Sequence, residues 1–293
     1  MCSKKWWMTM LLWGGWFVTA AAQDSDSINL AAQDPDFIHS SLVIIGPGDD
    51  EITGFGHAAI RMQCPSKELD YCFTFEMQST NIQWDLIRGT IPSGFVAGKT
   101  AVFLSQYDGT GRGITEYDLN LTPKEKQELW RQLDRELMKK MHWNYDFITV
   151  NCGSMCAWII ESILQGEHIV YHDLPAELTG TNTQAMHYAT KYAPWTELMF
   201  NLKHWSIRQE HGDFNDRLGP LFLEQVWQKA TLEDGEGHSR PLLLNKRVLT
   251  PQTLQPTRPW FTPLVALALL IGVIVLLVVY RGVIRKRKRS TKS

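Results

Sequence analysis

The stretch "ITVNCGSMCAWIIESILQG", residues 148–166, decides how this chain is interpreted. β-Branched residues lead up to Asn151, and the apolar residues after Cys152 recur at the spacing of a buried helix face. A helix is therefore predicted to begin at Asn151-Cys152 and to pack inward through Met155, Ile159, Ile160 and Ile163. Three roles are open to Cys152: a buried apolar residue, half of a disulfide, or a nucleophile. The rest of the sequence is needed to decide between them.

A cysteine at the start of a helix is well placed for nucleophilic chemistry. The free N–H groups and the helix dipole there favour a thiolate, and they also stabilise an oxyanion on an attacked carbonyl. Such a cysteine still needs a base, usually a histidine. His57 in "TGFGHAAI" is the best candidate, because it lies where a glycine-rich turn enters a strand. A cysteine that only packs is the competing interpretation, and four other histidines remain available as bases: His142, His168, His172 and His187.

The other cysteines leave the disulfide question open. Cys64 and Cys72 flank "PSKELDY", a predicted loop between two strands, so they either form a bridge or remain free thiols. Cys152 and Cys156 are four residues apart on one helix, a poor geometry for a disulfide. The sequence predicts no metal site and no cofactor.

The two ends of the chain predict a membrane-anchored protein of the cell envelope. Residues 1–22 have a basic start, a short apolar run and a final Ala-Ala-Ala, as in a secretory signal peptide; an uncleaved anchor is the alternative. Residues 263–280 carry no charge and are long enough to form a transmembrane helix. The tail at residues 281–293 has seven Lys or Arg, which places it in the cytoplasm. A single-pass protein of the bacterial cytoplasmic (inner) membrane with a periplasmic domain is expected.

The segment between the two ends divides into four parts. Residues 23–40 lead into a catalytic domain over residues 41–170, which a helical extension follows over 171–250 and a tether over 251–262. Without its basic tail the chain is acidic, which argues against a nucleic-acid partner.

Alternating and buried apolar patterns predict an α+β domain with an antiparallel sheet. Strands are expected at residues 41–48, 57–63, 71–77, 99–107 and 113–121, the last two forming a pair around a glycine-rich turn. A helix is expected to start at Thr122, with Pro123 in its first turn and Glu125 completing a capping box. A short helix at residues 218–230 and an extended piece at 239–249 follow.

Two separated pieces carry a family resemblance. "FGHAAIRM" followed far downstream by "YDFITVNC" resembles the circularly permuted papain-like superfamily, which includes the lecithin:retinol acyltransferase and NlpC/P60 groups. Within it the chain is most similar to the Lnb N-terminal periplasmic domain family, named for lipoprotein N-acylation. The matching pieces over residues 41–248 are "GPGDDEITGFGHAAIRM", "WDLIRGTIPSGF", "GRGITEYDLNLTPKEKQELWRQL", "YDFITVNCGSM" and "RPLLLNKRVL". Many members continue into several transmembrane helices, whereas this chain has one.

The resemblance implies roles for particular residues. Cys152 would carry an acyl group as a thioester, His57 would activate it, and Asn151 would support the site or the oxyanion pocket. A third, orienting polar group is expected on the strand after the histidine, where Thr74 and Glu76 are the candidates. Tyr145 and Asp146 either support the site from behind or form a structural corner. Arg88 and Arg112 either meet a phosphate head group or form surface salt bridges.

The expected function is that of a cysteine acyltransferase tethered to the membrane. Its donor would be a membrane phospholipid and its acceptor the N-terminal amine of a lipoprotein, with a membrane protein as a further possible partner. A papain-like cysteine hydrolase (peptidase or amidase) of the cell envelope and an inactive papain-like binding scaffold are the alternatives.

Overall fold

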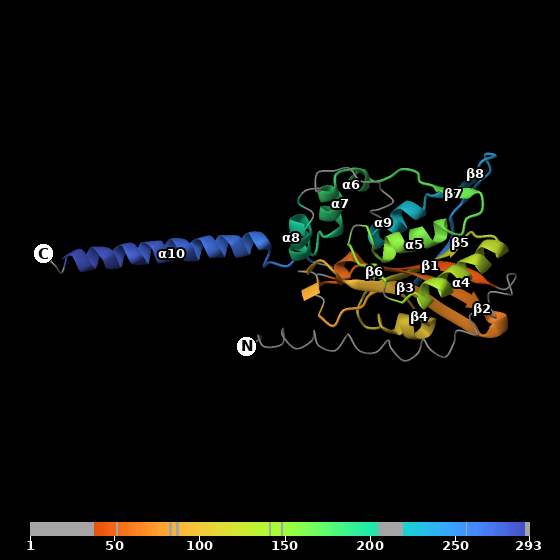
Figure 1. The fold of residues 1–293 in the computed structure, drawn as a ribbon, viewed down its shortest axis with the longest axis horizontal. Coiled ribbons are helices and arrows are strands. Elements are labelled where there is room, and N and C mark those ends of the chain that lie inside the picture. The colour runs from red at the N-terminus through yellow and green to blue at the C-terminus, as the bar shows by residue number, and fades with distance from the viewer. Residues whose placement is uncertain are drawn as a thin grey trace.

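A seven-stranded antiparallel sheet forms the centre of the protein (Figure 1). The computed structural model describes residues 38–290 except 51, 82–83, 86–87, 141, 148, 204, 206–218 and 256. The predicted signal peptide therefore lies outside the described residues. The sheet has the order β10-β5-β1-β2-β3-β4-β6. Its strands are β1 (His39–Ile45), β2 (His57–Cys64), β3 (Leu69–Met77), β4 (Pro92–Lys99), β5 (Ile114–Leu119), β6 (Trp143–Asn144) and β10 (Leu243–Thr250).

Helices cover the sheet and extend one end of the domain. They are α3 (Thr100–Ser105), α4 (Pro123–Met138), α5 (Cys152–Glu161), α6 (Ala176–Thr179), α7 (Asn182–Ala189), α8 (Pro194–Lys203), α9 (Pro220–Trp227) and α10 (Pro263–Ser290), with short 3-10 turns at Thr53–Phe55 and Pro65–Lys67. A small sheet of β7 (Glu167–Val170), β8 (Thr231–Asp234) and β9 (Ser239–Pro241) lies at the end of the domain away from α10 (Figure 1).

Strand alternation divides the core between the two faces of the main sheet. Leu42 and Ile44 of β1 pack in the larger core, which also holds buried residues of α4, α5 and α9. Val43 and Ile45 point the other way, into a smaller core closed by Phe103 of α3. This period of two is the physical basis on which the strand predictions rested.

Most predicted elements are confirmed. Strands β1, β2, β3 and β5 lie where the pattern placed them, and α4 begins with the predicted capping box of Thr122 and Glu125. The inward residues of α5 are at most 4% exposed. The short helix α9 and the late strand β10 also fall where expected.

One predicted strand is wrong. Residues 99–107 do not pair with β5; Thr100–Ser105 forms helix α3. Both edges of β5 are occupied, by β1 and by β10, and β4 takes the free edge of β3. With both edges of β5 occupied, the segment buries Thr100 and Phe103 at helical spacing.

The possible bridge between Cys64 and Cys72 is absent, and both are free buried thiols. The register of β2 and β3 pairs Cys64 with Leu69 and Cys72 with Arg61. The two side chains belong to different cores, so their sulfur atoms point apart.

The C-terminal helix projects away from the domain (Figure 1). Within α10, residues Pro263–Gly282 have a mean hydropathy of 3.0 and are long and apolar enough to cross a membrane. The segment before it is held at two places. Gln252 bonds to Gly113 N and Pro47 O, while the Trp195 side chain of α8 donates to Phe261 O at 2.9 Å.

Candidate active site

Cys152 is the first residue of α5 and is 2% exposed. Asn151 caps this helix, because its side-chain oxygen accepts the N–H groups of Gly153 at 2.9 Å and Ser154 at 3.1 Å. Ser154 completes a capping box through the Asn151 N–H. The carboxamide oxygen of Asn151 is thus engaged with the helix, so its observed role is to fix the backbone around Cys152.

His57 begins β2, directly after Gly56, whose φ of +74° suits glycine. Its Nε2 lies 2.6 Å from Thr74 Oγ1 and 3.1 Å from Glu76 Oε1. The Thr74 hydroxyl is also 3.2 Å from Ala58 O, to which it donates, so it accepts from an Nε2–H. Cys152 lies close enough to His57 to raise the pKa of the imidazole. Since Nε2 faces Thr74 and Glu76, Nδ1 is the nitrogen available to the thiol.

The charges around His57 keep its imidazolium form favourable. Burial by itself lowers the pKa of His57, but the electrostatic interactions with Cys152, Tyr107 and Glu76 together outweigh it. The pKa of His57 therefore lies well above its usual value. A histidine in this state can hold the proton of the thiol and later release it.

Tyr145 contacts Cys152 directly. Its hydroxyl lies close enough to the side chain and the backbone N–H of Cys152 to interact with both. Burial raises the pKa of Tyr145, and the neighbouring Cys152 and Glu76 raise it further, so the hydroxyl keeps its proton. Tyr145 therefore places a hydroxyl donor beside the sulfur atom.

Asp146 lies one residue further on but serves the loop. Its carboxylate accepts from Thr149 N at 3.2 Å and pairs with Lys203 of α8 at 3.2 Å. Its backbone pairs with Val150 in an isolated bridge. This bridge closes the loop that brings Tyr145 back beside Cys152.

Two aromatic residues near His57 were missed in the sequence. The Phe103 ring lies 6.2 Å from the His57 ring, and the Tyr107 ring lies 5.6 Å from that of Phe103. Both stand in the segment predicted as a strand, where no local pattern places them beside a histidine. Their position follows from helix α3, which only the folded sheet determines.

The two arginines have different surroundings. Arg88 stacks over Trp84, with 5.0 Å between its guanidinium carbon and the ring centroid. Arg112 is 8% exposed, so it is not a surface residue, and its Nε donates to Gly46 O at 2.8 Å.

An apolar cluster connects the site to the helices beside α10. Phe55 stacks on Phe147 at 4.9 Å and packs with Met186 of α7 and Phe200 of α8. Phe147 in turn contacts the Tyr145 ring at 5.1 Å. One side of the Cys152 site is therefore apolar.

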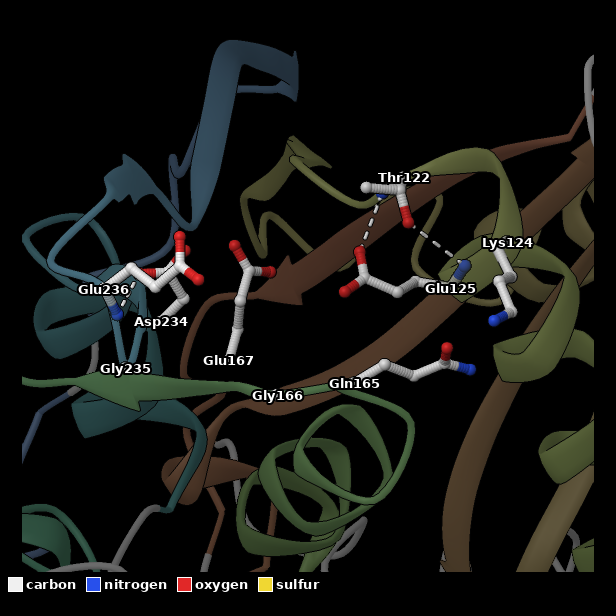
Figure 2. A pocket seen from close by; sticks show the side chains of 9 residues that line it. All are labelled: Thr122, Lys124, Glu125, Gln165, Gly166, Glu167, Asp234, Gly235 and Glu236. Carbon is white, nitrogen blue, oxygen red and sulfur yellow. Dashed lines mark hydrogen bonds between the residues drawn. The ribbon is translucent and has the colours of Figure 1, made fainter.

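A separate polar pocket of about 510 Å³ lies near the small sheet. Figure 2 shows carboxylates around it, including Glu125, Glu167 and Asp234, and none of its lining residues belongs to the Cys152 site. Arg240 pairs with both Glu125 and Glu167, so two of these charges hold β9 against α4 and β7. Asp234, Glu236 and His238 could together offer three ligand atoms to a metal ion. However, Asp234 already accepts the backbone N–H groups of Glu236 and His238.

Comparison with known proteins places the chain in a family. The model of the Lnb N-terminal periplasmic domain matches residues 25–180, which include Cys152, His57, Thr74, Glu76 and Tyr145. No curated protein and no solved structure matches the chain. A periplasmic domain followed by an apolar C-terminal helix fits a membrane-anchored protein. The match covers more than half of the chain, which therefore belongs to the Lnb N-terminal periplasmic domain family.

Proposed function

We propose that this protein is a membrane-anchored periplasmic cysteine acyltransferase with a permuted papain-like site. It moves an acyl chain from a phospholipid, through a thioester on Cys152, to the N-terminal amine of a lipoprotein. The observation that carries the proposal is the closeness of Cys152 to His57, whose Nε2 is held by Thr74 and Glu76. A nucleophile, a base and a group that orients the base are the parts that covalent acyl transfer requires.

The first half-reaction forms the thioester. His57 takes the proton of Cys152, and the sulfur attacks the ester carbonyl of the phospholipid. Tyr145, whose hydroxyl lies beside the sulfur, donates to the developing oxyanion. The ester C–O bond breaks, and His57 gives its proton to the leaving lysophospholipid hydroxyl.

The second half-reaction transfers the acyl chain. A neutral lipoprotein amine attacks the thioester, a C–N bond forms and the C–S bond breaks. His57 accepts the amine proton and returns it to the sulfur of Cys152. The amine must be unprotonated to attack, so this half-reaction accelerates as pH rises through the amine's titration.

The surroundings of the site favour a membrane substrate over a soluble one. The apolar cluster of Phe55 and Phe147 lies beside the site and joins it to α7 and α8. Helix α8 also bonds to Phe261, two residues before α10 begins. The site therefore lies near the end of the domain from which the proposed membrane anchor leaves.

The experiment is mass spectrometry of a host lipoprotein's N-terminal peptide, in cells that lack their other N-acylating enzymes. We expect the N-linked acyl chain with the wild-type protein and with Cys156→Ala, and its loss with Cys152→Ser. An unchanged N-terminus in Cys152→Ser cells would exclude lipoprotein N-acylation and leave the hydrolase or the scaffold.

A further inference from the structure

Arg112 is a buried cation without a counter-ion among the described residues. It is 8% exposed, its Nε is bonded to Gly46 O, and its Nη2 is buried with no hydrogen-bond partner. Its guanidinium carbon lies 5.1 Å from the Tyr107 ring centroid. An unpaired buried charge is costly, so a fold keeps one only where something compensates for it.

Three other arginines of the domain have different surroundings. Arg61 pairs with Asp70 at 2.7 Å and Glu116 at 3.0 Å. Arg240 pairs with Glu125 and Glu167, and Arg247 pairs with Glu116 and Asp118. Each of these three has two carboxylates, whereas the described part of the chain gives Arg112 none within ion-pair distance.

Arg112 lies at the same end of the sheet as the Cys152 site. Ile45, the last residue of β1, pairs with His57 on one side and with Ile114 on the other. Arg112 donates to the oxygen of Gly46, the residue that follows Ile45. Adjacent strands are about 4.8 Å apart, so this anchor lies close to His57. Burial lowers the pKa of Arg112, and the electrostatic interactions with Tyr107, Asp50 and Cys152 oppose this.

The loop that carries Arg112 also binds the segment that leads to α10. Thr253 and Leu254 donate their N–H groups to Gly111 O at 2.9 and 2.8 Å. Gly111 has a φ of +74°, and a Cβ there would come within 3.1 Å of Leu254 N, so both the turn and this close approach require glycine. Arg112 is therefore held between the site and the chain that runs to the membrane.

We propose that Arg112 binds the phosphate of the phospholipid that donates the acyl chain. The proposal rests on the function proposed above and names what recognises its donor. A phosphodiester supplies the missing negative charge, and the planar guanidinium matches its oxygens with parallel N–H donors. Head-group binding at Arg112 would place the ester carbonyl of the same lipid toward Cys152.

The test measures binding with the full-length protein in neutral detergent. Thermal unfolding is followed as phosphatidylglycerol is added, with diacylglycerol as the lipid lacking phosphate and inorganic phosphate as the soluble anion. We expect phosphatidylglycerol, but not diacylglycerol, to raise the melting temperature. In Arg112→Gln the apparent Kd should rise on the order of tenfold or more, as expected for losing a hydrogen bond to a charged group. The control Arg131→Gln, an exposed arginine of α4, should bind like wild type.

Two results would overturn the assignment. One is equal affinity for phosphatidylglycerol in Arg112→Gln and wild type; the other is stabilisation by inorganic phosphate with none by phosphatidylglycerol, which would indicate a free-anion site. If Arg112→Gln does not fold, Arg112→Lys decides, because lysine keeps the charge but loses the Nε anchor to Gly46. Weakened lipid binding in Arg112→Lys supports the proposal, and unchanged binding contradicts it.

Phosphate binding at Arg112 and acyl transfer by Cys152 can be tested separately with a Cys152 variant. Cys152→Ser should bind phosphatidylglycerol as the wild type does, since head-group binding needs no thioester. Lipid binding that depends on Arg112, without acylation of Cys152, would refute the acyltransferase and leave the phosphate site standing.

Discussion

At the scale of residues, Thr74 and Glu76 share one nitrogen of His57. The antiparallel register pairs Ala59 with Thr74, which brings the end of β3 beside the start of β2. Thr74 and Glu76, the two residues of β3 that could orient the histidine, therefore both contact His57. The neutral hydroxyl fixes the direction of the Nε2–H, and the carboxylate adds a negative charge that favours the imidazolium.

Glu76→Gln should narrow the pH range of thioester formation. His57 must be protonated to release the lysophospholipid, so the alkaline limb of this half-reaction follows the pKa of His57. Glu76 is one of the charges that raise that pKa, and its loss moves the limb to lower pH. At a pH above the new limb, the acylation rate of Glu76→Gln should be lower than that of the wild type by on the order of tenfold, equivalent to about 1.4 kcal/mol.

The measurement is the pH profile of single-turnover acylation of Cys152 by a phospholipid. Glu128→Gln on α4, which removes a carboxylate paired only with surface arginines, is the matched control. An alkaline limb that stays in place in Glu76→Gln would show that this carboxylate does not act through His57.

Tyr145→Phe should slow acylation without weakening substrate binding. The change removes the hydroxyl donor beside the Cys152 sulfur, and loss of such a donor costs about 10²-fold in kcat. KM should change little, because the interaction strengthens in the transition state. Steady-state kinetics would check this against Tyr117→Phe, whose hydroxyl bonds to Glu224 of α9 and does not contact His57 or Cys152. A normal kcat in Tyr145→Phe would restrict the residue to a structural role.

At the scale of elements, the N-terminus of α5 determines where the sulfur atom lies. Asn151 satisfies two helix N–H groups, and the loop before it is closed by the pairing of Asp146 with Val150. The cap therefore does two things: it stabilises the helix and it leaves the Cys152 N–H to Tyr145.

Asn151→Ala should lower both stability and thiol reactivity. Removing a buried N-cap costs about 1–2 kcal/mol of unfolding free energy. Thermal unfolding would measure this, and the rate of Cys152 alkylation by iodoacetamide would report on the site. The control Thr181→Ala removes a comparable cap from α7, so it should cost stability without changing alkylation. Equal alkylation rates in the two variants would contradict the role assigned to Asn151.

The elements differ in how far local sequence determines them. Strands β2 and β3 and helices α4 and α5 were predictable, because their periods, caps and breakers are carried by their own residues. Helix α3 was not, since whether an apolar segment pairs as a strand depends on which sheet edges remain free. The same applies within the site: Cys152 and His57 stand in recognisable motifs, whereas Phe103, Tyr107 and the burial of Arg112 arise from contacts between distant segments.

At the scale of the whole molecule, the site and the apolar helix α10 are held in one arrangement. The segment before α10 is bonded to the loop of Gly111 and Gly113 and, further on, to Trp195 of α8. The segment that leads to α10 is therefore bonded to the domain near the site and is not a free linker. Such an arrangement suits an enzyme whose donor and acceptor both lie in the bilayer surface.

The central claim is that Cys152 carries an acyl chain taken from a phospholipid. The most direct measurement incubates full-length protein with phospholipid vesicles, quenches in acid and locates the added mass by peptide mass spectrometry. We predict an acyl adduct on the Cys152 peptide that neutral hydroxylamine removes, that Cys152→Ser lacks and that Cys156→Ala retains. A wild-type protein without an adduct, or an adduct that persists in Cys152→Ser, would contradict the account.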